Sequence, residues 1–182
     1  MATWSNAYLG TIDTDYINSG TATWRVIIYG TSLSNTGQTY VRLTFKSSTT
    51  EPLLLNPVYI GERATSGDDY DFAVAPTQIT FNSGAGSFNI GTNAAATSDA
   101  INYAIPAGTA GIVISFTAPL ATANGFLRGN TNVGTAYYKT ATDASTQNAT
   151  GYSALGVYNL SLFKIEAGVD VSAFMPMVIF AD

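Results

Sequence analysis

Two short acidic clusters are the most obvious places where this sequence could do chemistry. They are Asp13-Thr14-Asp15 and Asp68-Asp69-Tyr70-Asp71, and hard cations such as Ca²⁺ bind in oxygen-rich loops of this kind. Neither cluster has the regular ligand spacing that makes a calcium-binding motif specific. We therefore interpret both clusters as solvated acidic turns and predict no metal site, with calcium binding as the minority alternative.

Side chains suited to catalysis are scarce in this chain. It contains no Cys and no His, which excludes thiol nucleophiles, disulfides, thiolate zinc sites and imidazole bases. A serine nucleophile would lack its usual activating base, and glycoside hydrolysis would need two carboxyl groups placed across a sugar bond. We predict that the chain is not an enzyme and uses no cofactor.

Aromatic side chains are the next group that could bind a ligand, since they make up 12% of the chain. Exposed Tyr or Trp beside Asn, Gln and Asp is typical of a sugar-binding surface. Weak candidates for such a glycan site are Tyr137, Tyr138 and Tyr152. The alternative is that most aromatic side chains fill a core or a subunit interface, where Tyr is also favoured.

Both ends of the sequence are more aromatic or apolar than free tails, which are usually disordered unless they are tied down. The segment 174–180 is either a last strand, which Pro176 would restrict to an edge or a bulge, or a contact with another subunit. The candidate interface residues are Trp4, Tyr8, Phe174, Met175, Met177 and Phe180.

The elements that would position these residues are predicted to be strands. Segments rich in Val, Ile, Thr, Tyr and Phe are separated by Gly, Asn, Ser or Pro, a pattern typical of a sandwich or barrel of short strands. We predict an all-β fold, an antiparallel two-sheet β-sandwich or jelly roll of about nine strands. The predicted strands are 23–29, 39–46, 53–62, 78–81, 87–90, 111–117, 135–139, 157–166 and 174–180.

The alternation of apolar and polar residues is clearest in 40–46, where Val41, Leu43 and Phe45 share one face. The segments 121–133 and 140–150 are the most polar, and we expect them to be loops. No linker or repeat divides the chain, which indicates one domain over 1–182. In it, 1–20 is an arm or first strand, and 172–182 is an apolar strand or an interface tail.

The charged residues of the chain indicate which classes of partner it can bind. Charged residues make up 10% of the chain, the formal net charge is -5, and the seven Lys and Arg residues are scattered singly. This disfavours nucleic acid as a partner. No segment is apolar enough for a membrane span and the N-terminus lacks the features of a signal peptide, so we expect synthesis in a cytoplasm.

Short motifs of strands and turns follow one another over 23–171: VRLTF at 41–45, EPL at 51–53, VYI at 58–60, ITF at 79–81, SD at 98–99, IPAG at 105–108, IVISF at 112–116 and GVDV at 168–171. This order of segments resembles the β-sandwich domain that precedes the catalytic domain in some GDSL-type (SGNH) esterases. In that family the hydrolase follows the sandwich and begins with a Gly-Asp-Ser block, with a His later in the chain, and this sequence has neither. The resemblance therefore implies the fold, and as an alternative function a carbohydrate-binding module, but not esterase activity.

The composition is also similar to that of accessory structural proteins of tailed bacteriophages. A charge-poor β-sandwich rich in Thr, Ser, Asn and Gly suits long exposure outside a cell, and neighbouring subunits can cover its edge strands. Our leading prediction is a non-enzymatic structural protein of a virion, a bacteriophage capsid decoration or fibre/spike component that forms a homo-oligomer and docks on a protein lattice. It would be located in the virion, with contact to host-surface polysaccharide as an open addition.

Overall fold

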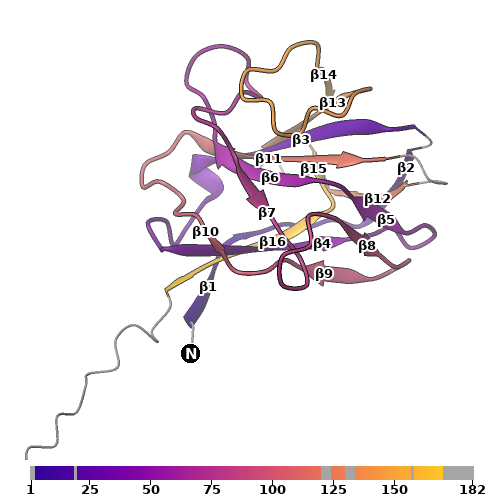
Figure 1. Ribbon diagram of the computed structural model, residues 1–182, viewed down its shortest axis with the longest axis horizontal. Coiled ribbons are helices and arrows are strands. Elements are labelled where there is room, and N and C mark those ends of the chain that lie inside the picture. The colour runs from indigo at the N-terminus through magenta and orange to yellow at the C-terminus, as the bar shows by residue number, and fades with distance from the viewer. Residues whose placement is uncertain (1–2, 19, 120–123, 130–133, 157, 170–182) are drawn as a thin grey trace, which may run out of the picture.

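The computed structural model describes residues 3–18, 20–119, 124–129, 134–156 and 158–169. This part of the chain forms an all-β structure of sixteen strands and one short 3₁₀ helix (Figure 1). The strands are β1 (Thr3–Leu9), β2 (Thr14–Asn18), β3 (Ala22–Tyr29), β4 (Tyr40–Lys46), β5 (Leu53–Leu55), β6 (Val58–Glu62), β7 (Thr77–Ile79), β8 (Phe88–Ile90), β9 (Ala95–Thr97), β10 (Ile101–Asn102), β11 (Gly111–Ala118), β12 (Asn124–Gly129), β13 (Gly134–Lys139), β14 (Ser153–Gly156), β15 (Asn159–Leu160) and β16 (Leu162–Val169), and the helix is η1 (Gly30–Ser32).

Antiparallel sheets pack together as the sequence predicts for a β-sandwich. A five-stranded sheet has the order β1-β16-β4-β10, with β9 also paired to β4, and a six-stranded sheet has the order β14-β13-β3-β11-β6-β7. Two smaller sheets, β15-β12-β2 and β5-β8, complete the described structure. Buried side chains from all four sheets form one main core, so the all-β prediction is confirmed, while the jelly-roll order of strands stays a prediction.

The alternating sequence of strand β4 explains why one of its two faces is buried. Val41, Leu43 and Phe45 are completely buried in the main core, and Arg42 and Lys46 point to the opposite, wetter face. Thr44 differs from the simple alternation, because it is nearly buried on that second face. Its hydroxyl group forms a hydrogen bond of 2.9 Å with the hydroxyl group of Thr97, its cross-strand partner on the neighbouring strand β9.

Strand β3 is buried on both faces. Trp24, Val26 and Ile28 face the main core, and Ile27 belongs to a second, smaller cluster on the outer face of the six-stranded sheet. Two loops cover that outer face, because Tyr70 and Phe72 come from residues 63–76, and Ala149 and Tyr152 come from residues 140–152. The second cluster therefore makes these loops part of the packed fold.

The segment 121–133, which we expected to be a flexible loop, contains a buried strand, and this expectation is wrong for residues 124–129. Strand β12 pairs with β2 on one side and β15 on the other. Its glycines bring it close to neighbouring backbone: a Cβ atom on Gly129 would lie 1.6 Å from the carbonyl oxygen of Thr11. The sequence pattern misses β12 because close backbone approach, rather than apolar alternation, fixes its place.

Two predicted strands are divided in the structure. Residues 53–62 form β5 and β6, with Asn56 and Pro57 between them. Within 157–166, Ser161 has a φ of 54° and separates β15 from β16.

The N-terminal 1–20 supplies two strands, β1 and β2, rather than an arm. The predicted strand 174–180 lies outside the described residues, and no described helix is long and apolar enough to cross a membrane.

Candidate binding surfaces

Trp4 lies on the outer face of the five-stranded sheet, opposite the main core. Its half-buried ring packs over Gly168 of β16, where an added Cβ atom would come within 2.8 Å of the ring. The guanidinium carbon of Arg42 lies 4.5 Å from the centre of the same ring. A cation–π contact of this kind holds the indole flat against the sheet, which leaves part of its surface available to a partner.

A small charge network stabilises this outer face. Glu166 Oε2 accepts a hydrogen bond from Arg42 Nε at 2.7 Å and pairs with Lys164 Nζ at 3.1 Å. Burial alone would raise the pKa of the Glu166 carboxyl group, but the hydrogen bonds from both cations outweigh that effect, and the pKa lies below its usual value. Glu166 therefore balances one of the two positive charges beside Trp4.

Strand β1 forms the edge of this sheet and carries no charged residue. Leu9, the cross-strand partner of Lys164, is 59% exposed. The free edge is covered at one point, where the backbone N–H group of Ser34 and the amide group of Asn35 donate to the carbonyl oxygens of Ala7 and Asn6. The rest of β1 is an uncharged edge of the kind that pairs with other strands.

The other predicted interface residues divide into two groups. Tyr8 is 3% exposed, and its hydroxyl oxygen accepts a hydrogen bond from Asn159 Nδ2 at 2.7 Å. It therefore contributes to the core of the chain rather than to an exposed surface, because the β-bulge between Asn6 and Tyr8 turns it inward. Phe174, Met175, Met177 and Phe180 lie outside the described residues.

Arg25 organises the second cluster on the outer face of the six-stranded sheet. It is fully buried, and its guanidinium group donates to the carbonyl oxygens of Tyr70, at 2.6 Å, and Thr146. The rings of Phe72 and Tyr152 lie 4.7 and 5.1 Å from its guanidinium carbon. Arg25 thus ties both covering loops to β3.

Tyr137 and Tyr152, two of the predicted glycan residues, both belong to this second cluster. The ring centres of Tyr137 and Tyr152 lie 5.0 and 4.9 Å from that of Tyr70. The Tyr152 hydroxyl group donates to Asp143 Oδ1 at 2.6 Å, and burial, followed by this hydrogen bond, raises the pKa of Tyr152. Tyr152 is 9% exposed, so it supports the loops and offers little surface to a sugar.

Tyr138, the third predicted glycan residue, points to the opposite face of β13 and is 38% exposed. Its ring lies 5.4 Å from that of Trp24, with an angle of 30° between the two planes. Tyr16 of β2 approaches Trp24 edge-on at 5.8 Å, and Phe126 of β12 lies 5.2 Å from it. We call Tyr16, Trp24, Phe126 and Tyr138 the aromatic end of the sandwich.

Arg128 extends the aromatic end along β12. Its guanidinium carbon lies 5.8 Å from the ring centre of Tyr16 and 5.2 Å from that of Tyr158. Burial and the nearby Tyr138 raise the pKa of Tyr16, against the opposing effect of Arg128. Aromatic surface and a partly exposed cation therefore lie together here, an arrangement that suits a ligand with both apolar and anionic parts.

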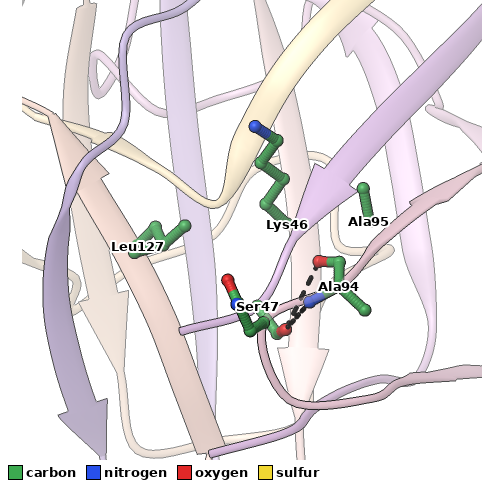
Figure 2. A pocket seen from close by; sticks show the side chains of 6 residues that line it. Lys46, Ser47, Ala94, Ala95 and Leu127 are labelled. Atoms are coloured by element: carbon green, nitrogen blue, oxygen red, sulfur yellow. Dashed lines mark hydrogen bonds between the residues drawn. The ribbon is translucent and has the colours of Figure 1, made fainter. Parts of the chain in front are cut away.

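A small hollow of about 180 Å³ lies between β4, β9 and β12 (Figure 2). Its lining residues are Lys46, Ser47, Asn93, Ala94, Ala95 and Leu127. The Ser47 hydroxyl group donates to the carbonyl oxygen of Gly91 at 2.6 Å and accepts from the backbone N–H group of Ala94 at 3.1 Å. These bonds hold the loop before β9 in place.

The carboxylate groups of the two acidic turns form hydrogen bonds and an ion pair with other residues of the chain. Asp71 accepts hydrogen bonds from the backbone N–H groups of Asp68 and Ala149, Asp69 pairs with Arg63, and Asp15 binds Thr49. Among the described residues no three acidic side chains come together to hold a metal ion. The structure therefore gives these clusters local structural roles.

Sequence reasoning missed Arg25, Arg42 and Arg128 as positioning or binding residues. Each is a single basic residue within a strand, and the sequence contains no local pattern that separates it from the other scattered cations. Their aromatic partners come from distant segments, so only the fold brings the contacts together. Comparison with known proteins gives no further guide, since no protein-family model matches the chain and no curated protein matches it significantly.

Proposed function

We propose that the chain is a non-enzymatic structural protein of a virion, a bacteriophage capsid decoration or fibre/spike component, that assembles with copies of itself and docks on a protein lattice. The observation that supports it best is β1: an uncharged edge strand, with Leu9 59% exposed at its end and Trp4 held flat beside it. The charge-poor, Cys-free composition agrees with this role.

A second copy of the chain fits this edge for a physical reason. A two-fold axis across β1 would place β1 antiparallel to its own copy and continue the five-stranded sheet across the interface at the residues that Ser34 and Asn35 leave uncovered. Because none of the seven residues of β1 is charged, no like charges would meet. Burial of Leu9 from both subunits would contribute roughly 1.5–3 kcal/mol for each fully buried side chain.

The test compares two apolar residues of similar exposure. Leu9→Lys places a charge at the proposed interface, and Val74→Lys, at a residue that is 64% exposed in another part of the chain, serves as the matched control. We expect light scattering after size exclusion to show an oligomer for the unaltered chain and for Val74→Lys, and a smaller species for Leu9→Lys. A monomeric unaltered chain, or equal effects of both substitutions, would contradict assembly through β1.

A second candidate function is carbohydrate binding, either as an added property of a virion protein or as that of a carbohydrate-binding module related to the accessory domain of GDSL-type esterases. Its specific support is the aromatic end, where the exposed ring of Tyr138 offers a flat apolar surface next to Tyr16 and Arg128. Sugar rings present apolar C–H faces that pack on such surfaces. Binding of a polysaccharide that Tyr138→Ala abolishes would test it.

A further inference from the structure

The cations of this chain differ in how their charge is balanced, and all seven are among the described residues. Four pair with carboxylates: Arg42, Arg63, Lys139 and Lys164. Arg25 is buried against two carbonyl oxygens. Lys46 and Arg128 remain, each facing aromatic rings without an ion pair to a described carboxylate.

Arg128 is the better placed of these two cations to bind an anion. Its guanidinium group is within cation–π distance of both Tyr16 and Tyr158, and its side chain is only partly buried. No hydrogen bond joins its side-chain nitrogens to any described residue. The rings of Tyr16 and Tyr158 therefore fix the position of the guanidinium group, while its N–H groups stay available to a ligand. Because the group is already held in place, less entropy is lost when a ligand binds.

The surface around Arg128 narrows the chemistry of the ligand. Phe126 and Tyr16 are cross-strand neighbours on β12 and β2, and Trp24 and Tyr138 face them from the six-stranded sheet. Trp24 and Phe126 are buried, so Tyr16, Tyr138 and Arg128 form the accessible part of this surface. A planar guanidinium group can bind a carboxylate through two parallel hydrogen bonds, and the exposed Tyr138 ring can pack against the C–H face of a sugar.

We propose that the aromatic end binds a saccharide that carries a carboxylate, such as a uronic or sialic acid residue, with Arg128 receiving the carboxylate and Tyr138 packing against the sugar ring. This inference rests on the second candidate function, carbohydrate binding, and adds the charge of the ligand. The net charge of -5 disfavours long polyanions in general, so recognition would depend on this local cation.

The experiment uses two pairs of sugars that differ only in the C6 carboxylate: glucuronic acid with glucose, and galacturonic acid with galactose. Binding at millimolar concentration is measured by saturation-transfer NMR and by titration of the full chain. We expect the acids to bind and the neutral sugars to bind at least roughly tenfold more weakly, a factor that corresponds to about 1.4 kcal/mol.

Two substitutions with the same change in charge separate recognition from general electrostatics. Arg128→Gln should abolish the preference for the acids, and Lys46→Gln, which removes a cation stacked 3.9 Å from the Phe163 ring, should preserve it. Arg128→Lys keeps the charge but loses the planar fork, so an intermediate affinity is expected. If Arg128→Gln perturbs the fold, as judged by its backbone NMR spectrum, Arg128→Lys takes its place, and an undiminished preference for the acids in that variant would overturn the role of the planar guanidinium group.

The outcomes distinguish the acid preference from carbohydrate binding itself. Equal binding of acids and neutral sugars would overturn the role of Arg128 and leave carbohydrate binding in place. No binding of any of the four sugars would overturn both. Equal losses in Arg128→Gln and Lys46→Gln would show that charge in general, rather than this site, attracts the acids, and would also overturn the proposal.

Discussion

Phe72→Ala tests whether the two loops on the outer face of the six-stranded sheet belong to the cooperative fold. The Phe72 side chain is 1% exposed, and its ring lies 4.7 Å from the guanidinium carbon of Arg25 and against Gly61. If the loops are packed as a second core, removing the ring should weaken the whole domain. If they are loosely attached, only the loops should change.

The size of the effect follows from two contributions. Replacing a fully buried Phe by Ala costs about 3–5 kcal/mol through lost burial and the cavity left behind, and the loss of a desolvated cation–π contact falls within that range or adds to it. We expect a decrease of about 4 kcal/mol in the free energy of unfolding, which would lower Tm by roughly 8–16 °C for a domain of this size.

Urea denaturation followed by tryptophan fluorescence measures this change, with Val74→Ala as the control. Val74 lies in the same covering loop but is 64% exposed, so its truncation should change stability by less than about 0.5 kcal/mol. A loss of under about 1 kcal/mol for Phe72→Ala, with unchanged hydrogen exchange in β3, would refute the second core. That result would also make Tyr152 and Tyr137 candidates for ligand binding again, because a loosely attached loop would leave their side chains accessible.

Two further predictions concern pH and a buried hydroxyl group. The pKa of Glu166 is lower in the folded chain than its ordinary value of 4.5, so its contribution to stability is present above that value and is lost as the pH falls through the folded-state pKa. Urea titrations from neutral to acid pH should show this loss, and Glu166→Gln should make stability less dependent on pH in that range. An unchanged pH dependence would count against the network. Tyr8→Phe should cost about 1–3 kcal/mol, because it leaves Asn159 Nδ2 without the buried acceptor that lies 2.7 Å away. Thermal unfolding checks this, and an unaltered Tm would contradict the assignment of Tyr8 to the core.

The sequence predicts the strands whose residues alternate or are uniformly apolar. Strands β3, β4 and β11 are found close to their expected bounds, because β-branched and aromatic side chains dominate each of them. Strand β12 could not be found in this way. Its sequence, Asn124 to Gly129, contains two glycines, which allow the backbone of neighbouring segments to come close. The pattern of apolar and polar side chains does not indicate a backbone contact of this kind.

The candidate surfaces were less predictable than the fold. A single tyrosine gives no sign of which face of a strand it occupies until the strand register is known, and this is why Tyr137 and Tyr138 were grouped although they point to opposite faces. Likewise, the residues that contact the guanidinium groups of Arg25 and Arg128 come from segments thirty or more residues away in the sequence. Long-range pairing of this kind is fixed by the whole fold rather than by local pattern.

The proposed assembly through β1 is tested most directly by a single cysteine on that strand. Because the chain has no native Cys, Ser5→Cys places a unique thiol on the exposed part of β1, and Ser66→Cys places one on an exposed loop elsewhere as the control. With the two-fold axis placed beside Ser5, this residue lies opposite its own copy, and antiparallel pairing brings opposed residues to disulfide distance. Mild oxidation should then convert Ser5→Cys into a covalent dimer. Cross-linking of Ser5→Cys no faster than that of Ser66→Cys would contradict the account.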